Sequence, residues 1–164
     1  MLGRQPRQRP PRGGGFDIDR GGKGTGMKQQ TFTILKPDTV AKRNCGAIIK
    51  RIEEEGFEIR GVKRVTLSED QAKAFYAVHR ERPFYRSLVT FMTEGPVWVM
   101  ALDRDNAVEH LRRIMGATDP AKADAGTIRA QFASSIERNA IHGSDSPENA
   151  RSEIAFFFAA SELL

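Results

Sequence analysis

The chain has 164 residues, of which 39% are hydrophobic, so it is long enough for one domain with a buried core. It has no apolar run of membrane-spanning length, and no apolar segment follows its N-terminal arginines, which argues against a membrane anchor and a secretory signal. Its single cysteine, Cys45, excludes an internal disulfide or a cysteine-rich metal site and indicates a reducing, cytoplasmic location.

The positive charge is concentrated near the N-terminus. Residues 1–26 contain six basic and two acidic residues, so they carry +4 of the net charge of +5. This segment is rich in Arg, Pro and Gly and nearly free of apolar residues, so we expect a disordered tail. Residues 27–164 then form the folded domain. Their near-neutral balance makes nucleic-acid binding unexpected, except for a weak attraction through the tail.

Hydrophobic periodicity places the elements of the domain along the chain. Strands are predicted at 31–36, 57–67 and 96–102, with a turn at Pro37-Asp38 and a further extended segment that ends near His142. Helices are predicted at 46–55, from Ser68 onward, from a cap at Asp103 or Asp105 to Gly116, and from 147 to about 158. The segment 116–138 is expected to be a long loop, and loops of that length in a compact domain are usually functional or disordered.

His142 is the first candidate for chemistry. It lies between a short apolar run and Gly143, and Ser146-Pro147-Glu148 then has the signature of a helix N-terminus. A histidine at such a junction is exposed enough to meet a substrate and rigid enough to aim its ring, and a neutral imidazole can act as a nucleophile or base. The alternative is that His142 merely fills a turn.

Other candidates also have two interpretations. Lys36, at the end of the first strand, is either solvated or a phosphate contact. Tyr76, on the helix that starts at Ser68, is either a core residue with a hydrated hydroxyl or a residue of the site. Phe84 either anchors a helical hairpin or stacks on a nucleotide base. Glu153 is either an exposed helix acid or the group that orients His142.

Several separated motifs, in order and at matching spacing, make residues 27–164 similar to the nucleoside diphosphate kinase family. They are K-P-D at 36–38, R-P-F-Y at 82–85, A-T-D-P at 117–120, G-T-I-R at 126–129 and N-x-x-H-G-S-D-S at 139–146. The resemblance implies transfer of the γ-phosphate from a nucleoside triphosphate such as ATP or GTP to His142, and then to a nucleoside diphosphate. The product of the first step is a phosphohistidine, and the mechanism is ping-pong.

The resemblance also assigns roles to the other candidates. Glu153 would hold the second ring nitrogen of His142, and Tyr76 would lie near the phosphates. Phosphate contacts would come from Lys36, Thr118, Arg129 and Arg112, the last favoured over Arg113 by spacing alone. Asn139 and Lys36 would contact the sugar hydroxyls, and Phe84 and Ile136 would enclose the base with little selectivity. Mg²⁺ would be held by the phosphates and water, because the motifs contain no carboxylate cluster.

The order of predicted elements resembles a βαββαβ ferredoxin-like sandwich of the α+β class. It would have a four-stranded antiparallel sheet with helices on one face, added helices, and a long loop before the last strand. The family implies a homo-oligomer of four or six subunits. Two other functions stay open from the residues: a non-catalytic regulatory module that does not need His142, and a nucleic-acid binder that uses the tail.

Overall fold

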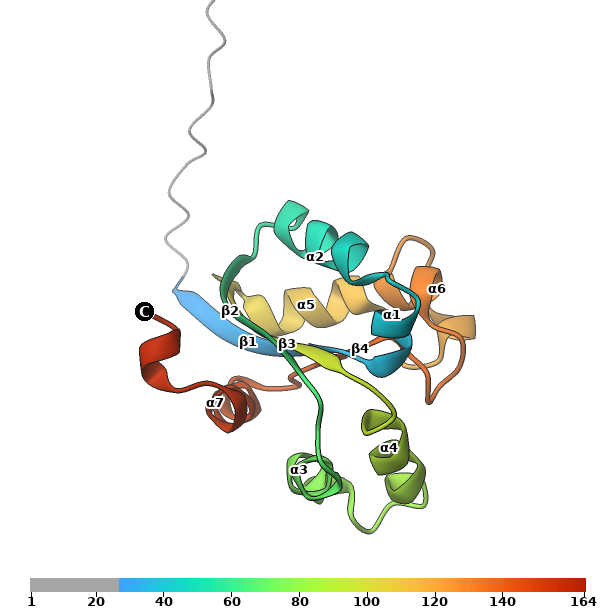
Figure 1. Ribbon diagram of the computed structural model, residues 1–164. Helices are drawn as coiled ribbons and strands as arrows, with labels where there is room; N and C mark the ends of the chain where they lie inside the picture. Colours follow the sequence, from blue (N-terminus) through green and yellow to red (C-terminus); the bar gives the residue numbers. More distant parts are fainter. Residues whose placement is uncertain (1–26) are drawn as a thin grey trace, which may run out of the picture.

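The sheet is built around β1 (Lys28–Leu35). In the computed structural model, which describes residues 27–164, β1 pairs antiparallel with β3 (Val97–Asp105) on one side and with β4 (Ile141–Gly143) on the other. β2 (Glu58–Val65) pairs antiparallel with β3, so the strand order is β2-β3-β1-β4 (Figure 1). The predicted four-stranded antiparallel α+β fold is confirmed. The expected tail at 1–26 lies outside the described residues.

The two central strands are longer than their apolar runs. β1 begins at Lys28, and Lys28–Gln30 pair with Asp103–Asp105, which extends β3 beyond the predicted end at Leu102. The prediction that Asp103 or Asp105 caps the next helix was therefore wrong, because both residues are in the strand. The N-cap of α5 (Ala107–Met115) is Asn106, with φ of 52°, and asparagine tolerates this left-handed conformation better than most residues.

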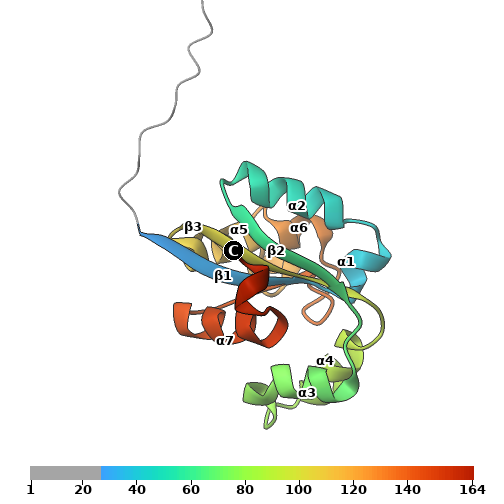
Figure 2. The ribbon, with the colours of Figure 1, turned by 60° about the vertical axis from the view of Figure 1, so that its left-hand side comes forward.

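Helices cover both faces of the sheet, whereas one covered face was predicted. α2 (Cys45–Glu54) and α5 pack on one face, and α7 (Pro147–Phe157) with the hairpin of α3 (Glu69–Phe75) and α4 (Tyr85–Met92) lies on the other (Figures 1 and 2). The reason is visible in β1, where Phe32 and Ile34 belong to one buried cluster and Leu35 to the other. A strand buried on both faces needs a helix layer on each.

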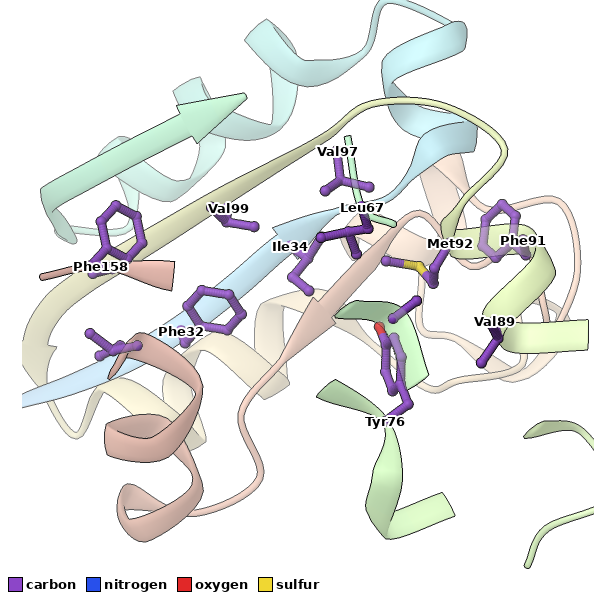
Figure 3. Close-up of a cluster of buried hydrophobic side chains, with 13 residues drawn as sticks. Phe32, Ile34, Leu67, Tyr76, Val89, Phe91, Met92, Val97, Val99 and Phe158 are labelled. Atoms are coloured by element: carbon purple, nitrogen blue, oxygen red, sulfur yellow. The ribbon is translucent and has the colours of Figure 1, made fainter. Parts of the chain in front are cut away.

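The cluster on the α7 side connects the sheet to the helical hairpin. Phe32 and Phe158 lie toward one end of it, and Tyr76, Val89 and Met92 lie toward the other (Figure 3). α3 and α4 pack against the sheet through this cluster and project away from it (Figure 1). Their projection leaves room for a cavity between the hairpin and the C-terminal half of the domain.

Short helices replace some of the predicted turns and loop. Pro37, at the first helical position, starts α1 (Pro37–Ala41), where only a turn was expected. The segment 116–138 contains a 3-10 turn at Pro120–Lys122 and α6 (Ile128–Phe132), which Thr127 caps through its hydroxyl. Within residues 27–164, no helix combines the length and apolar character that a membrane crossing requires.

Candidate active site

One cavity of about 770 Å³ contains every residue that the sequence marked as a candidate for catalysis or nucleotide binding. It lies between the α3–α4 hairpin, the C-terminal end of α5, the loop that follows α5, and β4. The candidate residues in its lining are Lys36, Tyr76, Phe84, Arg112, Thr118, Arg129, Ile136, Asn139, His142 and Glu153. The fold thus brings together side chains that are far apart in the sequence, from Lys36 at the end of β1 to Glu153 on α7.

His142 is fixed by β4 and oriented by an acid. His142 pairs with Ile34 of β1, and its backbone carbonyl accepts a hydrogen bond of 2.7 Å from the Thr33 hydroxyl. The ring Nε2 lies 3.1 Å from Oε1 of Glu153 on α7. Because a carboxylate oxygen only accepts, this contact requires the proton on Nε2 and leaves the lone pair on Nδ1. No group of residues 27–164 forms a hydrogen bond with Nδ1.

Glu153 is itself held in place. Its second oxygen, Oε2, accepts a hydrogen bond from the hydroxyl of Ser144, a residue with no exposed surface. Both His142 and Glu153 have 20% of their side-chain surface exposed. The pair therefore borders the cavity, while its hydrogen bonds face the protein. Sequence reasoning did not assign a role to Ser144, although the H-G-S-D-S motif contains it.

Aromatic rings pack around the imidazole. The ring centroids of Phe75 and Tyr76 lie 5.5 Å and 6.2 Å from that of His142, both with their planes nearly perpendicular to it. The Tyr76 hydroxyl is buried without a hydrogen-bond partner among the described residues. Burial, and then the negative charge of Glu153, raises the pKa of Tyr76 above its ordinary value, so this hydroxyl keeps its proton.

Lys36 is buried rather than solvated at the end of β1. It is 6% exposed, and its Nζ donates a hydrogen bond of 2.8 Å to Oδ1 of Asn139. Burial, followed by the positive charge of Arg129, lowers the pKa of Lys36 to about 8, while Asp38 and Glu137 act in the opposite direction. An anion that enters the cavity would therefore stabilise the protonated, positively charged form of Lys36.

Two arginines add to the positive charge. Arg129 is 8% exposed and donates to the carbonyls of Gly116 at 3.0 Å and Ile141 at 2.9 Å, while its Nε has no partner among the described residues. Burial, and then the charge of Arg112, lowers its pKa to about 10. Arg112 is exposed and lies 3.4 Å from the carbonyl of Gly143.

The choice between Arg112 and Arg113 follows from α5. Arg112 lines the cavity, whereas Arg113 donates to Nδ1 of His110, which is outside it. α5 reaches β4 closely because Gly143 has no side chain: a Cβ there would lie 2.5 Å from the sulfur of Met115. The glycine after His142 thus allows the helix that carries Arg112 to approach the ring.

None of the three cations is paired with an acid. Lys36, Arg112 and Arg129 form no salt bridge with any carboxylate of residues 27–164. Lys36 and Arg129 are buried, and buried charges without such partners are costly, so an anionic ligand would supply the missing counter-charge. The same part of the chain contains no cluster of three or more histidine, cysteine, aspartate or glutamate side chains that could hold a metal ion.

The mouth of the cavity carries exposed apolar side chains. Phe84, the N-cap of α4, is 48% exposed, and Ile136 is 60% exposed. Phe84 is therefore no buried anchor of the hairpin. Thr118, in the loop after α5, is also exposed. The cavity combines a positively charged, hydrogen-bonded inner end with an apolar, open mouth, which is the arrangement that a molecule with a phosphate chain and a flat ring requires.

Comparison with known proteins gives a consistent result. A family model described as nucleoside diphosphate kinase matches residues 29–163. The nucleoside diphosphate kinase of Granulibacter bethesdensis is 59% identical over 136 residues, which cover 83% of this chain and 97% of the relative. That of Helicobacter pylori (strain Shi470) is 57% identical over 137 residues, which cover 84% and 100%.

Solved structures agree in fold. The nucleoside diphosphate kinase of Aquifex aeolicus superposes with a TM-score of 0.82 at 42% identity, covering 84% of this chain and 100% of that one. The Halobacterium salinarum enzyme, solved in complex with CDP, superposes with a TM-score of 0.81 at 38% identity, covering 84% and 92%. The chain belongs to the nucleoside diphosphate kinase family.

Proposed function

We propose that His142 carries the phosphoryl group in the nucleoside diphosphate kinase reaction of this protein. The enzyme transfers the γ-phosphate of a nucleoside triphosphate to a nucleoside diphosphate by a ping-pong mechanism through a phosphohistidine, with broad base specificity. The observation that carries the assignment is the pairing of Nε2 of His142 with Glu153, which leaves the Nδ1 lone pair available beside three cations without acidic partners.

The first half-reaction follows from this arrangement. Nδ1 of His142 attacks the γ-phosphorus, the N–P bond forms, and the bond to the β,γ-bridging oxygen breaks, so that a nucleoside diphosphate leaves. Glu153 accepts the Nε2 hydrogen throughout and stabilises the positive charge that the ring gains. Ser144 keeps Glu153 in place. In the second half-reaction a different nucleoside diphosphate attacks the phosphorus, and His142 becomes the leaving group.

The surrounding residues stabilise the phosphates. Lys36, Arg112 and Arg129 provide positive charge for the phosphate chain and for the group in flight, and they are in place before the substrate arrives. Tyr76 and Thr118 offer neutral hydroxyls to the phosphate oxygens. Lys36 is already hydrogen-bonded to Asn139, and we assign the sugar hydroxyls to this pair.

The base occupies the mouth. Phe84 and Ile136 enclose it by apolar contact and stacking, which all bases offer. The Halobacterium salinarum relative was solved with CDP, a pyrimidine nucleotide. A mouth without a fixed hydrogen-bond pattern for the base edge suits purine and pyrimidine nucleotides alike.

Mg²⁺ fits this site as a partner of the nucleotide. Because the described residues contain no metal-binding cluster, the phosphates and water would hold the ion, as magnesium prefers. When bound, the ion neutralises phosphate charge and orients the phosphate chain. Lys36, Arg112 and Arg129 share the first of these tasks from the protein side.

We also infer the setting of the enzyme. Residues 27–164 are proposed as the catalytic domain, preceded by residues 1–26 as an N-terminal tail. The single cysteine supports a cytoplasmic location. A homo-oligomer of four or six subunits is proposed from family membership. Nucleic acid would bind weakly, through the tail.

The proposal is tested by forming the phosphoenzyme and then discharging it with an acceptor. Protein freed of host enzyme is incubated with ATP and Mg²⁺ without an acceptor, and then with GDP. We expect about one acid-labile, alkali-stable phosphate per subunit, which GDP removes as GTP. His142→Ala should take up none, whereas His79→Ala, which alters another histidine of the cavity lining, should still be phosphorylated. Phosphate uptake or ATP-to-GDP transfer by His142→Ala would refute the assignment.

A further inference from the structure

The backbone just before β4 contains a strained turn. Ala140 has a φ of 71°, a value that residues with a side chain rarely adopt, and it has no exposed surface. The N–H of Ile141 donates a hydrogen bond of 2.8 Å to the carbonyl of Asn139. Together these features describe a γ-turn centred on Ala140, of the rare type with positive φ. The turn directly joins Asn139 to the strand that carries His142.

One short segment bonds to both backbone groups of the turn residue. The Ala140 N–H donates to Oδ2 of Asp38 at 3.1 Å. Its carbonyl accepts from the N–H of Lys36 at 3.0 Å and from the hydroxyl of Thr39 at 2.8 Å. All three contacts come from the start of α1, about a hundred positions earlier in the chain.

Asp38 and Thr39 are buried, and their side-chain hydrogen bonds go to the turn residue. Asp38 is 5% exposed and Thr39 is 1% exposed. The only hydrogen bond of the Asp38 carboxylate within residues 27–164 is the one to Ala140, since its Oδ1 has no partner there. The Thr39 hydroxyl likewise bonds to Ala140. The Asp38 carboxylate is thus buried with one hydrogen bond, to Ala140, and with the positive charges of Lys36 and Arg138 acting on it.

We propose that Asp38 and Thr39 are positioning residues that hold Ala140 in its strained conformation and thereby fix Asn139 and His142 at their places in the cavity. The inference rests on the proposed role of His142 and concerns residues that line no part of the cavity. Without the two contacts, Ala140 relaxes toward negative φ, and the chain on the two sides of the turn rotates. Asn139 then leaves Lys36, and the His142 ring moves relative to Glu153.

Small displacements of this kind strongly lower the rate of phosphoryl transfer. The nucleophile must reach phosphorus in line, and a misplacement of about 1 Å can cost about a hundredfold in rate. Because Thr39 is uncharged and lines no part of the cavity, its loss should act on rate through geometry, whereas loss of Asp38 also removes a negative charge that acts on Lys36. Their removal should also become less harmful when the turn is no longer strained.

Thr39 gives the cleanest variants. Thr39→Val has the same shape without the hydroxyl, and Thr39→Ser keeps the hydroxyl. Thr31→Val is the matched control, because Thr31 is also fully buried on the sheet, but its hydroxyl has no partner among the described residues. Asp38→Ala and Asp38→Asn test the second contact. If Asp38→Ala fails to fold, the Thr39 pair decides the question.

The measurement is the rate at which ATP and Mg²⁺ phosphorylate the full-length enzyme in a rapid-quench experiment, with melting temperature as the check of folding. We expect Thr39→Val to be slower by about 10- to 100-fold. Thr39→Ser and Thr31→Val should stay near the wild-type rate. In the Ala140→Gly background the loss caused by Thr39→Val should shrink, because glycine adopts positive φ without a side-chain clash.

Two results would overturn the inference. The first is a folded Thr39→Val that is phosphorylated as fast as the wild type. The second is a loss of the same size in the Ala140 and Ala140→Gly backgrounds. Wild type and His142→Ala are run beside them. Phosphate on His142→Ala would refute the role of His142, whereas phosphate on His142 with a normal Thr39→Val rate would refute only the positioning role.

Discussion

The inner end and the mouth of the cavity are built in opposite ways. At the inner end, Lys36, Asn139 and Arg129 are between 5% and 8% exposed, and each is hydrogen-bonded to another part of the protein. At the mouth, Phe84 and Ile136 are 48% and 60% exposed. The inner end is therefore ordered before a nucleotide arrives, whereas Phe84 and Ile136 offer exposed apolar surface at the mouth.

This difference separates catalysis from selection of the base. Preorganised charges accelerate a reaction because they need no rearrangement as the transition state forms. An open apolar mouth instead accepts any flat ring, since stacking depends little on the identity of the base. One enzyme can thus fix the transferring phosphoryl group strictly and still handle many nucleotides. Each end should respond to mutation in its own way.

The largest effect is expected from the inner end. Arg112→Gln removes a cation from the cavity and should lower kcat/KM by about 10²- to 10³-fold, as the loss of a preorganised donor does in other enzymes. Arg113→Gln removes the same charge from the next position of α5, where the side chain bonds to His110. It should leave kcat/KM nearly unchanged. Equal losses in the two variants, measured by steady-state kinetics with ATP and GDP, would remove the distinction between them.

A smaller effect is expected at the mouth. Phe84→Ala should raise KM for adenine, guanine and cytosine nucleotides alike, with a loss of about 1–3 kcal/mol for each. The shared loss follows from the exposed ring, which stacks on every base. The check is KM for ATP, GTP and CTP in the variant and the wild type. Strong impairment for one base with normal values for the others would show that Phe84 selects the base.

The smallest effect is a shift in pH dependence. Lys36 has a pKa of about 8 because burial and Arg129 lower it. Below that pH Lys36 is protonated and can pair with phosphate. Because kcat/KM reports ionisations of the free enzyme, kcat/KM should fall as the pH rises above about 8. Glu137 raises the pKa of Lys36, and Glu137→Gln should move this alkaline limb to lower pH.

Glu94→Gln is the control for this shift. Glu94 is also an exposed acid, but it pairs with Arg138 and is not among the groups that perturb Lys36. Its pH profile should match that of the wild type. Identical profiles for Glu137→Gln and the wild type would mean that the alkaline limb belongs to another group.

The sequence predicted the elements of the fold better than their limits. Apolar residues located β1 and β3, but they did not reveal the pairing of Lys28–Gln30 with Asp103–Asp105. These polar residues have no pattern typical of a strand, and they become strand residues through their hydrogen bonds with the neighbouring strand. The second helix layer was missed for a related reason. Phe32, Ile34 and Leu35 lie in one short strand-forming segment, and such a segment does not indicate whether one or both faces of the strand are covered.

The site residues and the contact between Glu153 and His142 were predicted from motifs, whereas the other supporting contacts were not. Lys36 and Asn139 were both named, yet their hydrogen bond joins positions 103 residues apart. The same holds for Asp38 and Ala140, which are 102 residues apart. Nothing in an alanine indicates a positive φ, since that conformation is imposed by partners elsewhere in the fold. Contacts of this kind can be recognised only when the three-dimensional arrangement of the strands is known.

The most direct test of the account is the identity of the phosphorylated nitrogen. Glu153 holds Nε2 of His142 at 3.1 Å, so phosphorus should be on Nδ1. Enzyme phosphorylated with ATP and Mg²⁺ can be denatured in alkali and examined by ³¹P NMR, which distinguishes the two phosphohistidine isomers. We expect Nδ1-phosphohistidine at position 142. Phosphate on Nε2, or on any residue other than His142, would contradict it.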